Sequence, residues 1–304
     1  MTATPATREV SAVVVSFNTK GELLACLRSL EAQWDRLLEI IVIDNASEDG
    51  SAQAVRAAFP AARVLQNPTN EGFARASNRG LREARGRYAL ILNSDAELGE
   101  GALGALVRHL EAHPEVAAAG PRTRSPDGAA QVSFGPRLTP RSEWRQRRLV
   151  KGVKQGAAWA RREAERLASA EREPDWISGS CLLARRDALQ AVGYFDEGFF
   201  LYEEDADLCL RLRQAGWRIA FTPEAEVIHR LGSSMAKAPA LSRIEYQRSH
   251  LRYYRKHNGP LLTGALRGLL ALLALLRLAQ AAAFGSVEER RIQRAILGLA
   301  LGIV

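Results

Sequence analysis

The chain has 304 residues, 47% hydrophobic and 25% charged, a composition typical of a globular protein rather than a disordered or fibrous one. The net charge of +8 comes mostly from arginine, which suits phosphate contacts and favours an anionic ligand or surface. Three widely spaced cysteines exclude a disulfide framework and a cysteine-rich zinc site, and they indicate a reducing compartment. The first ten residues lack the apolar run of a secretory signal.

The first 120 residues alternate short apolar runs with amphipathic stretches. The apolar runs predict strands at 12–15, 40–43, 63–66, 88–92 and 116–119, the last at a sheet edge. The stretches between them predict helices near 23–30, 52–59, 73–84 and 100–113. This alternation is typical of an α/β fold with a parallel, doubly wound sheet and helices on both faces.

The middle of the chain interrupts this pattern. Four prolines mark loops after residue 120, and residues 141–172 then form a helical, densely basic stretch with ten Lys and Arg residues against four Glu. One interpretation is a solvated helix or flexible insertion, and the other is a lid that faces phosphate or a membrane.

Regular structure is expected again from residue 177. We predict strands at 177–184, 218–222 and 226–229 and helices at 186–192 and 204–215. A domain of residues 1–240 is therefore expected, followed by a basic, helical C-terminal region, 241–304. Within that region the leucine-rich stretch 261–284 is interrupted by Arg267 and Arg277, so we expect an amphipathic helix that lies in a membrane surface. The alternative is a helical hairpin that docks on the core or on a second subunit.

Polar clusters follow the predicted strands, where open parallel sheets bind their ligands. Four acids in five positions, from Glu203 to Asp207, repel one another unless a cation or a proton-transfer role offsets the cost. No phosphate-binding glycine loop follows the first strand, so a divalent cation that bridges to a diphosphate is the expected solution. Asp95 is the best candidate ligand, with help from Asn93 and His229.

In this order and spacing, the motifs resemble family 2 glycosyltransferases, which have the GT-A fold, and most closely their rhamnosyltransferase-like branch. The resemblance spans about residues 9–234. It rests on Val13-Val14-Val15-Ser16-Phe17-Asn18, Val42-Ile43-Asp44-Asn45-Ala46-Ser47, Asn70-Glu71-Gly72-Phe73 with Asn78, Leu92-Asn93-Ser94-Asp95, Gly179-Ser180, Gly193-Tyr194-Phe195-Asp196-Glu197, Phe199-Phe200-Leu201-Tyr202-Glu203-Glu204-Asp205-Ala206-Asp207, and Val227-Ile228-His229 with Gly232 and Ser233.

The resemblance implies a role for each matching residue. Asp205 is expected as the general base, with Glu204 and Asp207 as neighbouring acids, and Asp95 and His229 as ligands of Mg²⁺ or Mn²⁺. The nucleotide-sugar site is expected to contain Ser16, Phe17, Asn18, Asp44, Asn45, Gly72, Phe73, Asn78, Asn93, Ser94 and Asp95. The chain departs from the family pattern at Asn93-Ser94-Asp95, which replaces an Asp-x-Asp triplet, and at Arg230-Leu231-Gly232, which replaces a double glycine.

These roles suit sugar transfer with inversion, which needs a base for the acceptor hydroxyl and positive charge on the departing diphosphate. We therefore expect a metal-dependent, inverting glycosyltransferase of cell-envelope polysaccharide synthesis, with dTDP-L-rhamnose as the favoured donor and UDP- or GDP-sugars as alternatives. The expected acceptor is a polyprenyl-linked saccharide, or else a soluble glycan or glycolipid. A sugar-phosphate nucleotidyltransferase and a basic nucleic-acid-binding protein are the competing classes. We expect no nucleic-acid partner and a peripheral location on the cytoplasmic face of the membrane.

Overall fold

The computed structural model describes residues 8–230 and 238–303. Most of the first ten residues, which lack the apolar run of a signal, therefore lie outside the described residues, as do the motif residues Gly232 and Ser233. The described chain divides into two compact units. The first runs to Glu197 and resumes from Asp205 to Arg230, and the second comprises Gly198–Glu204 and the chain from Ala238 onward.

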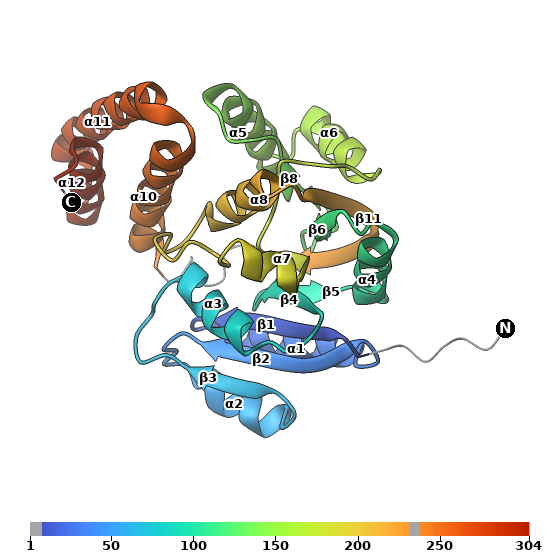
Figure 1. Cartoon of the computed structure of the whole chain (residues 1–304). Helices are drawn as coiled ribbons and strands as arrows, with labels where there is room; N and C mark the ends of the chain where they lie inside the picture. The colour runs from blue at the N-terminus through green and yellow to red at the C-terminus, as the bar shows by residue number, and fades with distance from the viewer. Residues whose placement is uncertain (1–7, 231–237, 304) are drawn as a thin grey trace. The chain divides into compact units, whose positions relative to one another are not determined.

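The first unit is built on one large sheet with the strand order β3-β2-β1-β4-β10-β6-β11-β5, and β7 is paired to β6 (Figure 1). The strands β3, β2, β1 and β4 are mutually parallel, as the sequence predicts. In the other half, β10 is antiparallel to both its neighbours and β5 is antiparallel to β11, so the sheet is mixed. The strands are Val10–Ser16 (β1), Leu37–Asp44 (β2), Arg63–Gln66 (β3), Tyr88–Asn93 (β4), Ala96–Leu98 (β5), Val116–Arg124 (β6), Ala130–Gln131 (β7), Cys181–Arg185 (β10) and Arg218–His229 (β11).

The structure corrects the prediction at three strands. The predicted edge strand at 116–119 belongs to β6, which lies inside the sheet between β10 and β11. The strand predicted at 177–184 is two strands, because Trp176–Ile177 (β9) pairs with Phe134–Gly135 (β8) in a separate small sheet. The two short strands predicted near the end of the unit form the single strand β11, with an irregularity between Thr222 and Glu226.

Helices cover both faces of this sheet (Figure 1). The alternation of strand side chains explains why, since Ala12 and Val14 join one apolar core with α1 and α4, whereas Val13 joins a second core with α3, α7 and α8. All three cysteines are buried thiols, as expected. The helices of this unit are Lys20–Glu31 (α1), Ser51–Ala58 (α2), Phe73–Glu83 (α3), Ala102–Ala112 (α4), Pro140–Lys154 (α5), Ala158–Ala168 (α6), Arg186–Ala191 (α7) and Glu204–Gln214 (α8), whose first residue, Glu204, belongs to the second unit.

The basic stretch 141–172 forms two helices, α5 and α6, rather than one. Thr139 caps α5 in a reciprocal pair with Ser142. Gly152 lets the helices approach closely, because a Cβ there would meet the Cβ of Ala160 at 2.6 Å. The guanidinium of Arg148 lies over the exposed rings of both Trp144 and Trp159.

The second unit contains the helices Pro239–His257 (α10), Gly259–Phe284 (α11) and Val287–Leu301 (α12), which pack against one another. Their small shared core includes Ala274, Ile292 and Ile296. Arg267, one of the two arginines that interrupt the apolar run, donates from Nε to the carbonyl of Ala300 at 2.7 Å. This charge therefore turns toward the end of α12, and the leucines of α11 remain exposed on the other side of the helix.

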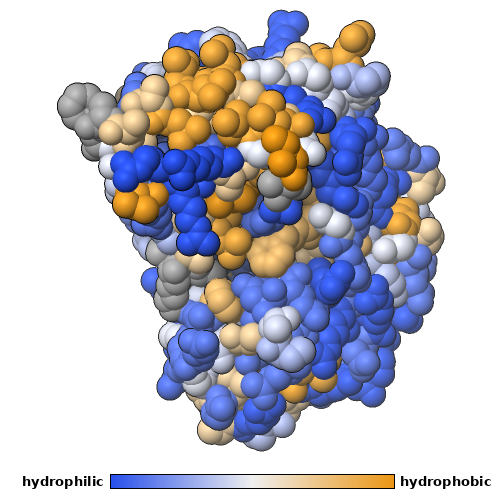
Figure 2. Space-filling view, turned by 90° about the vertical axis from the view of Figure 1, so that its left-hand side faces the viewer, coloured by the Kyte–Doolittle hydropathy of each residue, from blue (hydrophilic) through white to orange (hydrophobic). Residues whose placement is uncertain are grey.

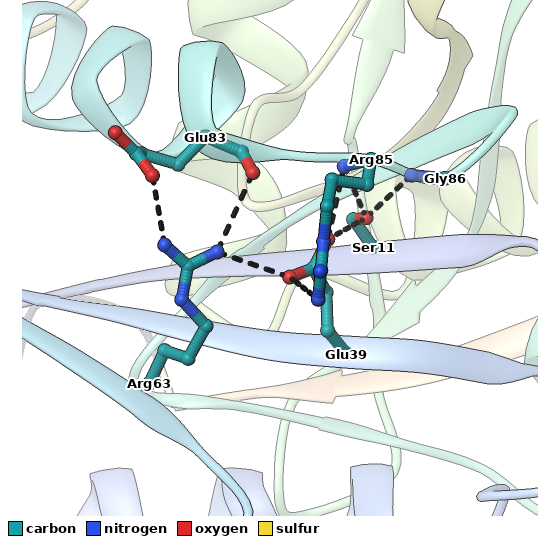
Figure 3. Close-up of polar contacts among 6 residues, drawn as sticks. All are labelled: Ser11, Glu39, Arg63, Glu83, Arg85 and Gly86. Carbon is teal, nitrogen blue, oxygen red and sulfur yellow. Dashed lines mark hydrogen bonds and ion pairs between the residues drawn. The ribbon is translucent and has the colours of Figure 1, made fainter.

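A buried carboxylate fastens the turn between α3 and β4 to the first two strands (Figure 3). Oε1 of Glu39 on β2 accepts hydrogen bonds from the hydroxyl of Ser11 at 2.8 Å and from the amide of Arg85 at 2.9 Å. Its Oε2 accepts from the guanidinium groups of Arg63 and Arg85. Burial raises the pKa of Glu39, but the hydrogen bonds from Ser11 and Arg85 outweigh burial and hold this pKa below its ordinary value.

We predict that Glu39→Gln lowers the free energy of unfolding by about 1–3 kcal/mol at neutral pH, because a charged acceptor of several buried donors is lost. Since the folded-state pKa is lowered, this contribution is complete above the ordinary glutamate pKa of about 4.3 and disappears as the pH falls through the lowered value. Urea denaturation of both proteins at several pH values measures the difference. The exposed Glu31→Gln on α1 is the control, and an equal difference at all pH values would contradict the assignment.

Candidate active site

The parallel register brings the polar ends of three strands to one edge of the sheet. Ser16 at the end of β1 lies opposite Asp44 on β2, and Val15 lies opposite Asn93 on β4. Hydrogen bonds between side-chain hydroxyl groups link the same strand ends. The Thr19 hydroxyl lies 3.0 Å from that of Ser16 and 2.7 Å from that of Ser94. Ser16 and Ser94 are buried and hold this edge together.

The loop after β1 is fastened to the loop after β2. Asn18 has a left-handed backbone, with φ at 54°, and this conformation suits asparagine. Its amide donates to the Ser47 hydroxyl at 2.9 Å, and its side-chain oxygen accepts from the amide of Glu48 at 2.8 Å. Asp44 accepts from the Ser47 amide and from the side chain of Gln66. Phe17, between these contacts, is half-buried.

The side chain of Asn45 connects the end of β2 to the loop of residues 67–72. Its side-chain oxygen accepts from the side chain of Asn67 and the amide of Glu71, and its nitrogen donates to Asn70 Oδ1 at 2.7 Å and to the carbonyl of Gly72. Both the oxygen and the nitrogen of the Asn45 amide group are therefore hydrogen-bonded to other groups of the protein. The composition of this stretch suggested a binding loop, whereas the amide network inside it appears only in the folded structure.

Asn78 has a similar internal role. It is buried on α3, where its side chain donates to the carbonyl of Phe195 at 2.9 Å and accepts from the amide of the same residue at 3.0 Å. Its nitrogen also lies 3.1 Å from Glu197 Oε1. Asn78 therefore anchors the chain that leads toward the acidic cluster.

Asp205 lies next to Gly179, which also packs against the ring of Phe73. Its Oδ2 accepts from the amide of Gly179 at 2.9 Å, and its Oδ1 from the amide of Ala206 at 2.7 Å. A Cβ on Gly179 would lie 3.5 Å both from the Cβ of Asp205 and from the ring of Phe73. Burial raises the pKa of Asp205, and the two amide hydrogen bonds oppose this shift. A carboxylate with a raised pKa is a better proton acceptor.

Asp95 and His229 form a carboxylate–imidazole pair at this edge of the sheet. Asp95 Oδ1 lies 3.2 Å from His229 Nε2, and the Asn93 side chain lies 3.5 Å from the same nitrogen. The antiparallel pairing of β5 with β11 sets this proximity, because His229 is opposite Ala96. Within residues 8–230 and 238–303, no three acidic, histidine or cysteine side chains are grouped as a metal site. The carboxylate and imidazole fit a divalent cation that takes its other ligands from a diphosphate and water.

The remaining two predicted acids differ from Asp205. Asp207 is fully buried, and its Oδ2 accepts from Arg211 Nε at 2.7 Å, while the same guanidinium donates to the carbonyls of Val192 and Tyr194. Arg211 was not among the predicted residues, although its spacing of four from Asp207 on a helix is a recognisable signal. Glu204 is buried and belongs to the second unit.

The comparisons with known proteins identify the family. The model of glycosyl transferase family 2 matches residues 11–192, and that of glycosyl transferase family group 2 matches residues 161–284. The chain belongs to the family 2 glycosyltransferases. A similar protein is an N-acetylglucosaminyl-diphospho-decaprenol L-rhamnosyltransferase of Mycobacterium tuberculosis, which is 34% identical over 284 residues and covers 86% of this chain and 90% of its own. The resemblance to the rhamnosyltransferase-like branch is therefore confirmed.

Solved structures confirm the GT-A fold. The mannosyltransferase PcManGT of Pyrobaculum calidifontis, in complex with GDP-Man and Mn²⁺, matches 98% of this chain and 87% of its own with a TM-score of 0.57 and 19% identity. TarS 1-349 of S. aureus, in complex with UDP-GlcNAc, matches 97% of this chain and 81% of its own with a TM-score of 0.55 and 18% identity. Of the three competing classes, the family supports the glycosyltransferase.

Proposed function

We propose that this glycosyltransferase moves L-rhamnose from dTDP-L-rhamnose, with inversion, to a polyprenyl-diphosphate-linked saccharide of the cell envelope. The sugar and the lipid-linked acceptor are supported by the name of the M. tuberculosis relative, which aligns over most of both chains. The observation that carries the chemistry is the placement of Asp205 on the Gly179 amide beside Phe73.

In this proposal Asp205 takes the proton of the acceptor hydroxyl as that oxygen attacks the anomeric carbon. The Gly179 amide fixes one carboxylate oxygen, and burial raises the pKa of Asp205. Asp95 and His229 hold the divalent cation, which when bound neutralises charge on the departing diphosphate. The ends of β1, β2 and β4 hold the nucleotide, with Phe17 and Phe73 as half-buried rings and Asp44 as a buried carboxylate. Asp207 positions the site through Arg211.

We predict that Asp205→Asn abolishes transfer and leaves binding of dTDP nearly unchanged, because the amide keeps the size of the carboxylate but cannot accept the proton. The loss is ~10²–10⁴-fold in kcat. Transfer from dTDP-L-rhamnose to N-acetylglucosaminyl-diphospho-polyprenol measures it, with UDP- and GDP-sugars as competing donors. Asp187→Asn is the matched control, since that aspartate also accepts a hydrogen bond from the next amide of its helix, α7. Transfer by Asp205→Asn at more than a tenth of the wild-type rate would assign the base elsewhere.

A second prediction concerns the cation. Asp95→Ala should abolish the Mn²⁺-dependent part of dTDP binding, because it removes the only carboxylate of the proposed pair. Calorimetry with dTDP, with and without Mn²⁺, measures the difference. Glu97→Gln is the control, since this carboxylate lies two residues further on and pairs with Arg230 at the surface. Equal Mn²⁺ dependence in Asp95→Ala and in the control would refute the assignment.

We also propose peripheral attachment to the anionic cytoplasmic leaflet through α11. By length and composition alone, Gly259–Ala282 could cross a membrane, with a mean hydropathy of 1.8. Its leucines are exposed, and Figure 2 shows hydrophobic side chains gathered on this face. Since Arg267 bonds to the end of α12, this arginine need not enter the lipid when the leucine face does. The basic residues of α10 add attraction of ~1 kcal/mol each near anionic lipid.

We predict that replacing the three exposed leucines Leu269, Leu272 and Leu276 together by Glu abolishes flotation with anionic liposomes and leaves dTDP binding unchanged. Burial of these side chains in lipid is the driving force, so charge on the same face removes it. The control is Leu38→Glu, another exposed leucine, on β2. If the wild-type protein does not float, or if light scattering shows instead that the triple substitution dissociates a dimer, the face is a protein interface.

A further inference from the structure

The segment Gly198–Glu204, called here the strap, leads directly into Asp205. It belongs with α10 to the second unit, whereas Glu197 before it and Asp205 after it belong to the first. Each end is fixed within the first unit. Glu197 accepts hydrogen bonds from Asn78 and Arg82, and Asp205 accepts from the amide of Gly179. The conformation of the strap therefore decides how the chain enters α8.

The strap has an unfavourable backbone conformation at its end. Tyr202 and Glu203 are consecutive non-glycine residues with positive φ, at 72° and 62°. Side chains with a Cβ seldom adopt this left-handed region, and two in succession persist only when surrounding contacts hold them. Such strain is found at functional sites, where neighbouring structure fixes the chain in one arrangement.

One face of α10 supplies those contacts. The hydroxyl of Ser242 lies 2.7 Å from that of Tyr202, and the hydroxyl of Ser249 donates to the carbonyl of Leu201 at 2.7 Å. His250 Nδ1 lies 2.7 Å from Glu203 Oε1. Spacings of seven and eight residues place these three α10 side chains on one helix face. Their hydrogen bonds hold three successive residues of the strap, Leu201, Tyr202 and Glu203.

His250 also packs against two aromatic rings of α10. Its side chain is almost completely buried, and its ring stacks on that of Tyr246 at 5.8 Å and 9° and contacts that of Tyr254. At the start of the strap, Gly198 allows Arg252 to approach, since a Cβ on this glycine would lie 2.0 Å from the guanidinium carbon. The same guanidinium lies over the buried ring of Phe199.

We propose that His250 is a positioning residue for the reaction, because it holds Glu203 and thereby sets the left-handed turn that delivers Asp205 to the Gly179 amide. His250 bonds to Glu203 and acts on the base only through the chain. This inference rests on the proposed role of Asp205. It assigns to α10 a function in catalysis that is separate from any membrane attachment by α11.

His250→Ala should lower kcat between about ten- and a hundredfold, since small misplacement of a reacting group costs rates of that order. The affinity for dTDP and the KM for the donor should stay within about twofold, because no residue of the strap is among those proposed to hold the nucleotide. His250→Asn should restore most of kcat, since its side-chain nitrogen can occupy the place of Nδ1 and bond to Glu203. His257→Ala, on the last turn of the same helix, is the matched control.

Two further variants keep the test decisive if His250→Ala fails to fold. Ser249→Ala removes the hydrogen bond to Leu201 with little change in volume, and it should lower kcat about two- to fivefold, in keeping with the loss of one neutral hydrogen bond. Glu203→Ala should lower kcat as His250→Ala does, and the double variant should lose no more than either single one, because both remove the same contact.

The inference is overturned if these variants keep kcat within about twofold of wild type, or if kcat and dTDP affinity fall together and His250→Asn restores neither. Activity of Asp205→Asn distinguishes failure of the proposed function from failure of the positioning role. If that variant is active, the proposed function fails. If it is inactive while the His250 and Ser249 variants transfer sugar normally, only the positioning role fails.

Discussion

The parallel register of β1 with β2 and β4 is the constraint on which the site depends. β1 is apolar on both faces and buried between two helical layers, so a slip of one residue would exchange the side chains that each core receives. The same register sets Ser16 opposite Asp44 and Val15 opposite Asn93, and the loops that follow these strands therefore meet at one edge. Hydrogen bonds through Thr19 and Asn45 then lock those loops together.

Several polar residues of this edge are hydrogen-bonded to other parts of the protein. Asn45 and Asn78 use their amide groups on neighbouring backbone and side chains, and Asp207 is bound to Arg211. Buried polar groups must find such partners, because an unpaired one costs more free energy than a hydrogen bond returns. A site with polar walls thus requires polar residues that pair with one another, and these residues fall in the same sequence motifs as the other candidate site residues.

The second unit has two different kinds of surface along its length. α10 turns one face to the strap, through Ser242, Ser249 and His250, while α11 exposes leucines. The packing of α11 also gives one of the two arginines in its apolar run a partner, because Arg267 bonds to the carbonyl of Ala300. An arginine within an apolar run can therefore contribute a hydrogen bond to a helical bundle while neighbouring leucines stay exposed.

The sequence by itself determined the parallel half of the sheet, the order of its helices, the family and the list of candidate residues. Those features depend on local periodicity and on motifs whose spacing is visible along the chain. The tertiary structure alone decided that the sheet is mixed, that β6 is internal, and that Asp95 meets His229 across 134 positions. It also decided the partners of each acid, since Asp205 and Asp207 lie two positions apart in one acidic motif but accept from different groups, the Gly179 amide and the Arg211 guanidinium. Long-range contacts of this kind leave no periodic trace, because each depends on where strands pair rather than on how residues repeat.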